Sequence, residues 1–443
     1  MAVVGTKQGA SLMVAAESSF GSVDATAARD FDTTAIAALT AYPMRVLRAS
    51  WNSAAGALRQ VVLDQQEIST RGGTPAPIVE SASALGLQTM RLVGEISVDV
   101  ELRGFGANVP SSTGLGIMLS SGLAHSLVSA GTTATATYAT VNTFTVGGGD
   151  LAEFVAGRCV FVEQADGTDR LCKVTNVNGG SSTITTLEAH GYSGAGTFTV
   201  RQAHMWYPPV DGAADGASLV LQFAPRDSAF VYVAVGARLS GFSAKLQGKV
   251  VVGTLKFLVP DGFYFAANIV PVPAKMLPLG VTGTTPLRTL VSPVLVTQDH
   301  SSSSVPYSGT ATALPVRDWS VDVAVALEPT PDQGTRSGIS GYSVAEAMCS
   351  GSFTVNAPSS GVDWRDQLRF QESRAVGLTA AGSVAAGNGF GIWVGSADAT
   401  EDPGITFEDS RRSQAVAFRA GDYGGDTAGA EYANAPFCIC FKS

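Results

Sequence analysis

Charge is scarce in this sequence of 443 residues. Charged side chains make up only 15% of it, against about 25% in an ordinary soluble domain, and the formal net charge is −9. A protein that grips nucleic acid needs clustered lysines and arginines to displace phosphate counterions, and the sequence has no such cluster. We therefore expect the chain to repel DNA rather than bind it.

Long apolar runs are also missing. No stretch approaches the roughly 20 uninterrupted apolar residues that a membrane-spanning helix requires, and the first residues lack the apolar run of a secretory signal. The five cysteines are scattered and odd in number, so they do not form a disulfide framework. These features favour synthesis in the cytoplasm with reduced thiols.

Catalytic motifs are absent as well. None of the four histidines lies in a local cluster that suits zinc, and no GxSxG motif places a serine nucleophile on a strand-to-helix turn. We interpret the histidines as ordinary surface or interface residues; they are His125, His190, His204 and His300. We expect no enzyme, and we assign no catalytic residue, no cofactor and no metal site.

Two cysteines near the C-terminus fall on one apolar strand. Alternation puts the thiols of Cys438 and Cys440 on one face of it and Phe437, Ile439 and Phe441 on the other. No further metal ligands lie nearby in the sequence. The pattern therefore indicates small core or interface residues rather than a metal site.

What the sequence does have is glycine, proline and alternating strands. Glycine and proline account for 50 and 20 residues, and 45% of residues are hydrophobic, enough to build sizeable cores. The clearest strand is 95–103, in which Ile96, Val98 and Val100 point one way and polar residues the other. Comparable strands are predicted at 218–223, 230–235, 248–259, 319–327 and 351–356.

Helical patterns are few. Residues 112–127 could form a helix capped by Ser111, Ser112 or Thr113, although its glycines weaken the pattern. Residues 360–372 fit helical spacing better. Each predicted helix follows a strand and is followed by more strands, which indicates a mostly β fold with flanking helices.

The segment 131–202 is predicted to be a separate small unit. Its expected strands are 143–146, 158–163, 170–177, 182–187 and 197–200, with glycine-rich turns between them. Strands of this length and spacing predict a small β-barrel or sandwich inserted into a larger domain. Cys159 and Cys172 flank a predicted hairpin and would share a face, so a disulfide is possible, but buried free thiols are the expectation for a cytosolic product.

Two pairs of segments indicate an internal duplication. Residues 94–100 (GEISVDV) resemble residues 351–357 (GSFTVNA), and each leads into one of the predicted helices. Residues 232–240 resemble residues 391–399, and each is followed by an apolar strand. The order and type of the segments agree better than the letters, which indicates two related domains.

Taken in order, several segments resemble the tail tube protein (major tail protein) family of tailed bacteriophages. Residues 15–23 (AAESSFGSV) are similar to the family's E-S-T-Y/F-G-T segment, and residues 94–103, followed by 115–123, resemble its G-x-F-x-x-E-L-R strand and the helix after it. The family's central hairpin and closing strands are matched by 218–223, 232–252, 392–403, 415–420 and 434–441. The insertion 131–202 departs from the family, as does Ile96, where an aromatic residue is usual.

The resemblance implies a mostly β fold of two tandem tail-tube-type β-sandwich domains, each with a flanking helix, plus an inserted small β-barrel or sandwich domain. The first domain, with an N-terminal arm, would span 1–130 and 203–280, the insertion 131–202, and the second domain 281–443. Family members place six such domains in a ring, as hexamers or as pseudo-hexameric trimers of two-domain chains. Stacked rings form the tube that conducts DNA.

The resemblance also implies partners and a location. The partners would be other copies of the chain, other tail proteins, and DNA that passes through the lumen without specific binding; no membrane is involved. The protein would be made in the host cytoplasm and reside in the virion. We take Asp99 and Glu101 as lumen-facing acids, since an acidic wall would not stick to DNA, and the 131–202 unit would decorate the outer surface.

Two other interpretations stay open at this point. A virion-surface or secreted β-rich adhesin or glycan-binding module fits the composition equally well, although the five tryptophans are dispersed rather than clustered. A β-solenoid glycan hydrolase would need a short regular repeat, which the sequence lacks. The leading hypothesis is a structural virion protein without catalysis.

Overall fold

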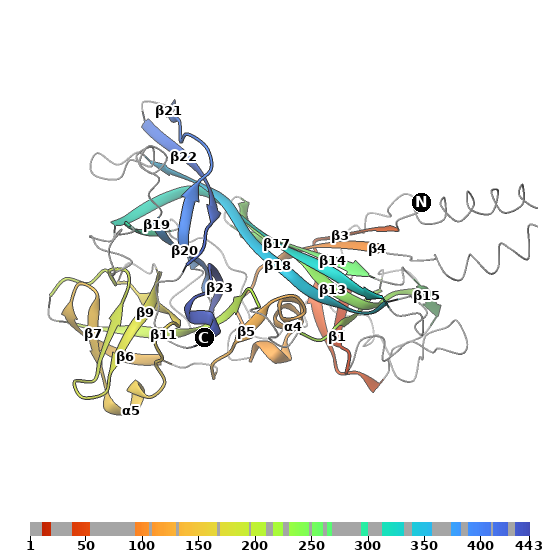
Figure 1. Cartoon of the computed structure of the whole chain (residues 1–443), viewed down its shortest axis with the longest axis horizontal. Helices are drawn as coiled ribbons and strands as arrows, with labels where there is room; N and C mark the ends of the chain where they lie inside the picture. The colour runs from red at the N-terminus through yellow and green to blue at the C-terminus, as the bar shows by residue number, and fades with distance from the viewer. Residues whose placement is uncertain are drawn as a thin grey trace, which may run out of the picture.

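Antiparallel β-strands make up most of the residues that the structure describes (Figure 1). The computed structural model describes residues 11–18, 38–53, 94–105, 109–129, 133–165, 169–194, 196–209, 216–224, 230–247, 250–259, 264–267, 294–299, 312–331, 339–356, 374–381, 389–408, 411–423 and 430–443. These residues contain 23 strands and only short helices. The prediction of a mostly β fold is confirmed.

The strands on either side of the insertion form one unit, which we call the first half. They are β1 (Ser11–Ala16), β2 (Ala41–Arg45), β3 (Arg48–Ser53), β4 (Gly94–Glu101), β12 (Leu219–Ala224), β13 (Phe230–Gln247), β14 (Val250–Val259) and β15 (Tyr264–Ala267). Their pairing order is β2–β1–β12–β13–β14–β4–β3, and β15 pairs with β13. On β4 the alternation is as predicted, because Ile96, Val98 and Val100 are buried while the residues between them are not.

A short helix, α4 (Gly114–Ser120), packs on the first half. Thr113 caps it by accepting a hydrogen bond from the amide of Gly116 at 3.2 Å, as expected for one of the three predicted caps. The predicted helix over 112–127 is too long. Residues after Ser120 turn away, and β5 (Ala124–Ser126) pairs with a strand of the insertion instead. The helix predicted at 360–372 lies outside the described residues.

The inserted segment folds into a closed six-stranded barrel. Its strands are β6 (Thr133–Thr140), β7 (Thr143–Val146), β8 (Cys159–Glu163), β9 (Asp169–Asn178), β10 (Thr183–Thr186) and β11 (Thr197–Tyr207), with one turn of helix, α5 (Gly148–Leu151), after β7. Pairing runs β6–β7–β10–β9–β8–β11 and returns to β6. Side chains such as Phe144, Ile184 and Phe198 fill the interior, so the predicted small barrel is confirmed as a packed unit without a channel.

The remaining strands form the second half. They are β16 (Val294–Asp299), β17 (Thr312–Pro331), β18 (Ile339–Asn356), β19 (Arg374–Ala381), β20 (Gly389–Ala399), β21 (Ile405–Glu408) and β22 (Arg411–Ala420). Pairing runs β16–β17–β18–β22–β20–β19 and returns to β16, and β21 pairs with β22. β17 and β18 are much longer than predicted, because residues such as Thr330 and Ser343 extend them without an apolar signal.

The two halves share one pairing order. Five strands of the first half correspond to five of the second: β1 to β16, β4 to β18, β12 to β19, β13 to β20 and β14 to β22. Within its own half each of these strands has corresponding neighbours, and β17 takes the combined place of β2 and β3. The registers agree as well. Trp51 stands opposite Ile96, and Trp319 stands opposite Phe353, which occupies the matching position of β18.

A second register pair gives the same alignment. Gly94 of β4 faces Val259 of β14, and Gly351 of β18 faces Phe418 of β22. The offset in residue number from Gly94 to Gly351 equals that between the similar segments 94–100 and 351–357. The offset from Val259 to Phe418 equals that between the similar segments 232–240 and 391–399. The pairing therefore aligns the two halves as their sequences do.

The last strand, β23 (Phe437–Lys442), lies between the second half and the barrel, paired with β20 on one side and β11 on the other. Phe437, Ile439 and Phe441 belong to the main core, which draws on both halves. Cys438 and Cys440 face a separate cluster between the barrel and the second half, which we call the seam. The predicted alternation of this strand is confirmed.

The predicted common face of Cys159 and Cys172 is wrong. In the β8–β9 register Cys159 is opposite Lys173 and Cys172 is opposite Val160, so the two cysteines are one position out of step. Cys159 faces the seam and Cys172 the barrel interior. All five cysteines are free and buried.

Candidate assembly interface and buried ionic seam

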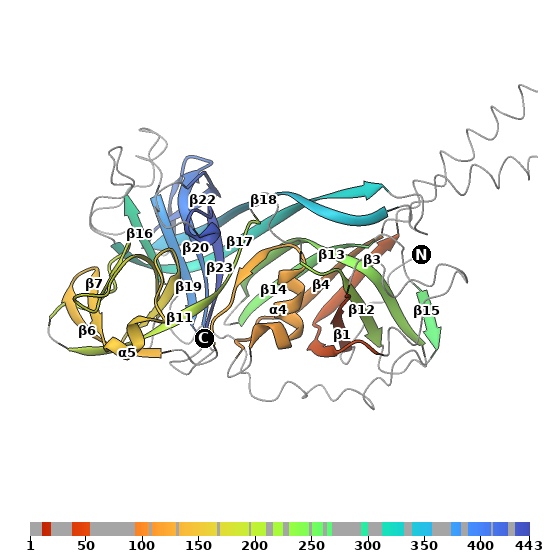
Figure 2. The same cartoon turned by 60° about the horizontal axis from the view of Figure 1, so that its bottom comes forward.

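The two halves join edge to edge. β13 of the first half pairs with β17 of the second, from Gly241 opposite Ala324 to Lys245 opposite Ser320. The result is a continuous run of strands in the order β3–β4–β14–β13–β17–β18–β22–β20, and each half contributes four of them in equivalent places. Both views show β17 and β18 running from the other strands of the second half, near β20 and β22, to the first half (Figure 2).

One face of this sheet is apolar and the other is polar. Val98, Phe242, Leu255, Val323 and Phe353 lie on the apolar face, in the main core. The polar face carries hydroxyl and charged side chains that follow the register from strand to strand. One row consists of Arg48, Asp99, Thr254, Ser243, Asp322, Ser350, Arg419 and Asp398, and every member is at least partly exposed.

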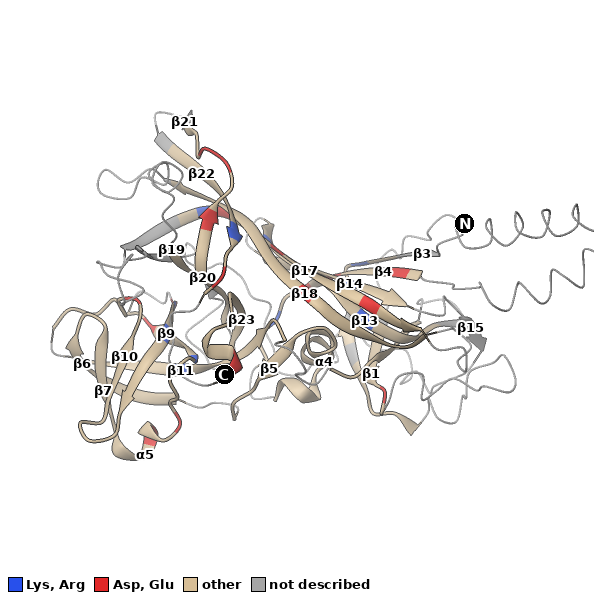
Figure 3. Cartoon of the chain, in the orientation of Figure 1, with Lys and Arg blue, Asp and Glu red and all other residues tan. Residues whose placement is uncertain are grey.

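Both acids singled out in the sequence lie on this polar face. Asp99 accepts a hydrogen bond from the hydroxyl of Thr254 at 2.7 Å, and Glu101 pairs with Arg103 at 3.1 Å. Charged residues are sparse on the strands of the sheet (Figure 3). The face is therefore wet, lightly charged and lined mainly by small side chains.

β3 pairs with β4 on one side and with no other described strand, so the sheet has an open edge there. At the other end, β20 pairs with β19 and β22 and ends at Ala399. The shift that aligns β13 with β20 puts residues 400–404, which follow β20 outside any strand, in the place of 241–245, the stretch of β13 that meets β17. Open edges are templates for pairing with another chain.

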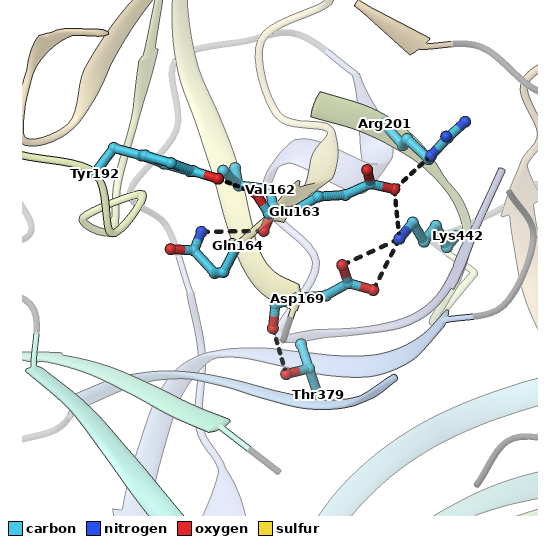
Figure 4. A network of polar contacts seen from close by, with 8 residues as sticks. All are labelled: Val162, Glu163, Gln164, Asp169, Tyr192, Arg201, Thr379 and Lys442. Carbon is cyan, nitrogen blue, oxygen red and sulfur yellow. Dashed lines mark hydrogen bonds and ion pairs between the residues drawn. The ribbon is translucent and has the colours of Figure 1, made fainter. Parts of the chain in front are cut away.

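A buried ionic cluster lies where the C-terminal strand meets the barrel (Figure 4). Lys442, fully buried, places its Nζ 3.0 Å from each carboxylate oxygen of Asp169 and 2.7 Å from Oε1 of Glu163. The same Glu163 oxygen accepts from Nε of Arg201 at 2.7 Å. Thr379 of β19 donates to the main-chain oxygen of Asp169 at 2.8 Å, so three parts of the fold meet here.

A second buried cluster crosses the seam. Glu188, on the loop after β10, accepts from the amide of Lys173 at 2.8 Å and from the indole nitrogen of Trp393 at 2.7 Å. The ammonium of Lys173 donates to the carbonyl of Ala433 and lies 4.0 and 4.5 Å from the ring centroids of Trp393 and Tyr423.

Burial dominates the titration of both seam carboxyls. It raises the pKa of Asp169 to about 6, although the charge of Lys442 opposes the shift. It raises the pKa of Glu188 to about 7, against the hydrogen bonds from Lys173 and Trp393.

The histidines are not all surface residues. His204 and His190 are fully buried, and burial, then the charge of Arg158, lowers the pKa of His204 to about 4. His190 packs among Phe144, Tyr192 and Phe198 of the barrel. His125 is exposed, and His300 lies outside the described residues.

The seam charges were not predicted from the sequence. One signal was available, because Lys442 is the lone charge at the end of the apolar segment FCICFK. A lysine that continues a buried strand needs anionic partners. Nothing local in the sequence identifies those partners, since Asp169 is 273 residues away.

Among the described residues there is no group of histidine, cysteine, aspartate or glutamate side chains arranged to hold a metal ion. Within the same residues no helix is long and apolar enough to cross a membrane. No protein-family model matches the chain, and a search of curated proteins finds no match.

Proposed function

We propose that this chain is a structural virion protein whose rings stack into the tail tube of a tailed bacteriophage, the conduit for DNA ejection. The observation that carries the proposal is the pairing of β13 with β17. It joins two four-stranded units of the same pairing order side by side within one chain. It is therefore a template for how units of neighbouring copies would join.

In this proposal each half is a tail-tube-type domain and the barrel is an insertion. β3 of one copy would meet residues 400–404 of the next copy, which would extend β20 on assembly, as β17 meets β13. Such a head-to-tail contact closes into a ring when the rotation fits, and closure covers the open edge of β3. Three chains would then supply six equivalent units.

Charge on the polar face supports the same arrangement. The row across the sheet begins with Arg48 and ends with Asp398, so its two ends carry opposite charge, which favours association of one copy with the next. Between the ends the face carries hydroxyls and acids such as Asp99 and Asp322. It also carries three dispersed basic residues, which are Lys245, Lys256 and Arg419. Facing the lumen, it would let DNA, with one negative charge per ~1.7 Å, pass without binding.

Electron microscopy of the purified chain tests the proposal. We expect open-ended tubes with a lumen wide enough for duplex DNA, and averaged end views with three chains per ring. Monodisperse monomers that bind a glycan would overturn the proposal in favour of an adhesin. End views with six identical chains per ring would keep the tube and overturn the trimer.

A further inference from the structure

Lys442 and Asp169 are placed as reaction partners as well as an ion pair. The amine nitrogen lies 3.0 Å from each carboxylate oxygen, so the two side chains are in direct contact (Figure 4), and rotation of the carboxyl group about its Cβ–Cγ bond would turn its carbon toward the nitrogen. Lys442 is fully buried and Asp169 is 1% exposed. A site with this little water penalises the charged form of the Asp169 carboxyl, whose pKa burial raises to about 6.

We propose that Lys442 and Asp169 form an intramolecular isopeptide bond, with Glu163 transferring the proton. The bond would join Nζ of Lys442 to Cγ of Asp169. This inference does not depend on ring assembly or on the tail tube.

The reaction needs no oxidant and no cofactor. The ammonium of Lys442 first gives one proton to the Asp169 carboxylate, leaving a neutral amine and a carboxylic acid. The amine attacks the carboxyl carbon, and Glu163, 2.7 Å from Nζ, accepts the proton that the nitrogen loses. Glu163 then returns that proton to the departing hydroxyl, so one amide forms, one C–O bond breaks and one water leaves.

Two properties of the site favour this reaction. Burial already raises the pKa of Asp169 to about 6, toward the protonated form that the attack requires. The reacting groups are held in contact by folded strands, and well-oriented intramolecular pairs react as if at about 10⁵–10⁸ M. Arg201 holds Glu163 in place through its Nε, at 2.7 Å.

The other buried lysine of the seam is a natural comparison. The ammonium of Lys173 donates to the carbonyl of Ala433 and lies over the ring of Trp393. Its neighbour Glu188 accepts a hydrogen bond from the backbone amide of Lys173. Lys442, by contrast, contacts one carboxylate with which it can react and a second, that of Glu163, that can transfer the proton, so the structure assigns the reaction to Lys442.

The product would be a covalent link between two distant parts of the chain. Lys442 is on β23 and Asp169 begins β9 of the barrel, 273 residues apart in sequence. Strand β23 could then not be withdrawn from between β11 and β20 without breaking a covalent bond. The barrel would stay attached to the second half under force or denaturant.

Intact-mass spectrometry of the full chain under denaturing conditions tests the proposal. We expect a mass lower than that of the encoded sequence by one water molecule, and a branched peptide joining Lys442 to Asp169 after digestion. The encoded mass in the freshly folded and in the aged protein would overturn the proposal.

Variants assign the roles. Asp169→Ala and Lys442→Arg should restore the full mass, whereas Lys173→Arg, the matched change at the other buried lysine, should leave the water loss intact. Glu163→Gln keeps both reacting groups and should slow the bond at least a hundredfold, followed as the fraction linked over time. An unchanged rate in Glu163→Gln would overturn the role of Glu163, and water loss in Asp169→Ala would overturn that of Asp169.

Discussion

The carboxylate of Glu188 accepts a hydrogen bond from the indole nitrogen of Trp393 at 2.7 Å, across the seam between the barrel and the second half. Both side chains are fully buried. Three glycines of the second half, Gly377, Gly389 and Gly391, let the barrel and the C-terminal strand approach this closely, because an added Cβ at each would lie under 3.0 Å from Leu171 or Lys442. The barrel is thus closely packed against the second half and the C-terminal strand.

The attachment of the barrel should depend on pH through Glu188. Its pKa is raised to about 7 in the folded chain, so the docked state binds this proton more tightly than an undocked one. The stabilisation is fully present below the ordinary pKa of a glutamate and is lost as the pH rises to about 7. We expect the free energy of unfolding to decrease by up to about 3 kcal/mol as the pH rises from about 5 to 7. The midpoint temperature of thermal unfolding should fall with it.

Calorimetry across this range measures the effect. Glu188→Gln should lower stability by about 1–3 kcal/mol, because an amide cannot accept both hydrogen bonds, and should flatten the dependence on pH. A variant with the same slope as the original chain would show that another group titrates.

Gly377→Ala should loosen the barrel. The added Cβ would lie 2.8 Å from the carbonyl oxygen of Leu171, and backbone cannot yield there unless β9 separates from β19. We expect a loss of about 1–3 kcal/mol and faster hydrogen exchange in β9. Gly179→Ala is the matched control, because nothing lies within 4 Å of its added Cβ. Equal effects of the two changes would argue against close packing at Gly377.

Reversing charge on the polar face should create DNA binding inside the tube. Glu95 and Asp322 are both exposed on that face, so Glu95→Lys with Asp322→Lys adds positive charge where DNA would pass. We expect assembled tubes to retain a short labelled duplex at low salt and to release it as salt rises. The control is Asp150→Lys with Glu153→Lys, the same charge change at barrel positions that are at least partly exposed. Equal retention by both variants would contradict a lumen-facing sheet.

Blocking the edge at β3 should stop assembly. The amide of Ser50 points to β4, and the amide of Ala49 points to the open edge, because the odd residues of β4 face β3. Ala49→Pro removes that edge amide hydrogen and puts a ring where a neighbouring strand would pair. We expect monomers in place of tubes, whereas Ala49→Ser, which is of similar size and keeps the amide hydrogen, should assemble normally. Light scattering measures the assembly, and thermal unfolding checks that the monomer is still folded. Tubes from a folded Ala49→Pro chain would show that this edge is not the interface.

Alternation was the part of the fold that the sequence predicted well. Ile96, Val98 and Val100 are buried on one side of β4, and Cys438 and Cys440 share a face of β23 opposite three large apolar residues. These predictions work because a side chain's direction in a strand is a local property. The barrel was predictable for the same reason, since its strands are short and separated by glycine-rich turns.

Properties that depend on which strands meet were not predictable. The register of β8 with β9 turns Cys159 and Cys172 to opposite faces, and a shift of one residue would have made the prediction right. Residues 124–126 leave the predicted helix because β11 offers them a pairing partner. The seam joins Lys442 to carboxylates that no sequence pattern places near it.

The position of β23 constrains when the molecule can finish folding. β11 ends at Tyr207, but its partner along residues 203–206 is residues 439–442. At about 5–20 residues per second, the ribosome needs on the order of ten to fifty seconds to make the chain between them. During that interval the barrel can close on itself. The C-terminal end of β11 has no β23 to pair with, and the hydrophobic surface around Trp206 is exposed to solvent. Synthesis of this protein in quantity should therefore be sensitive to crowding among nascent chains.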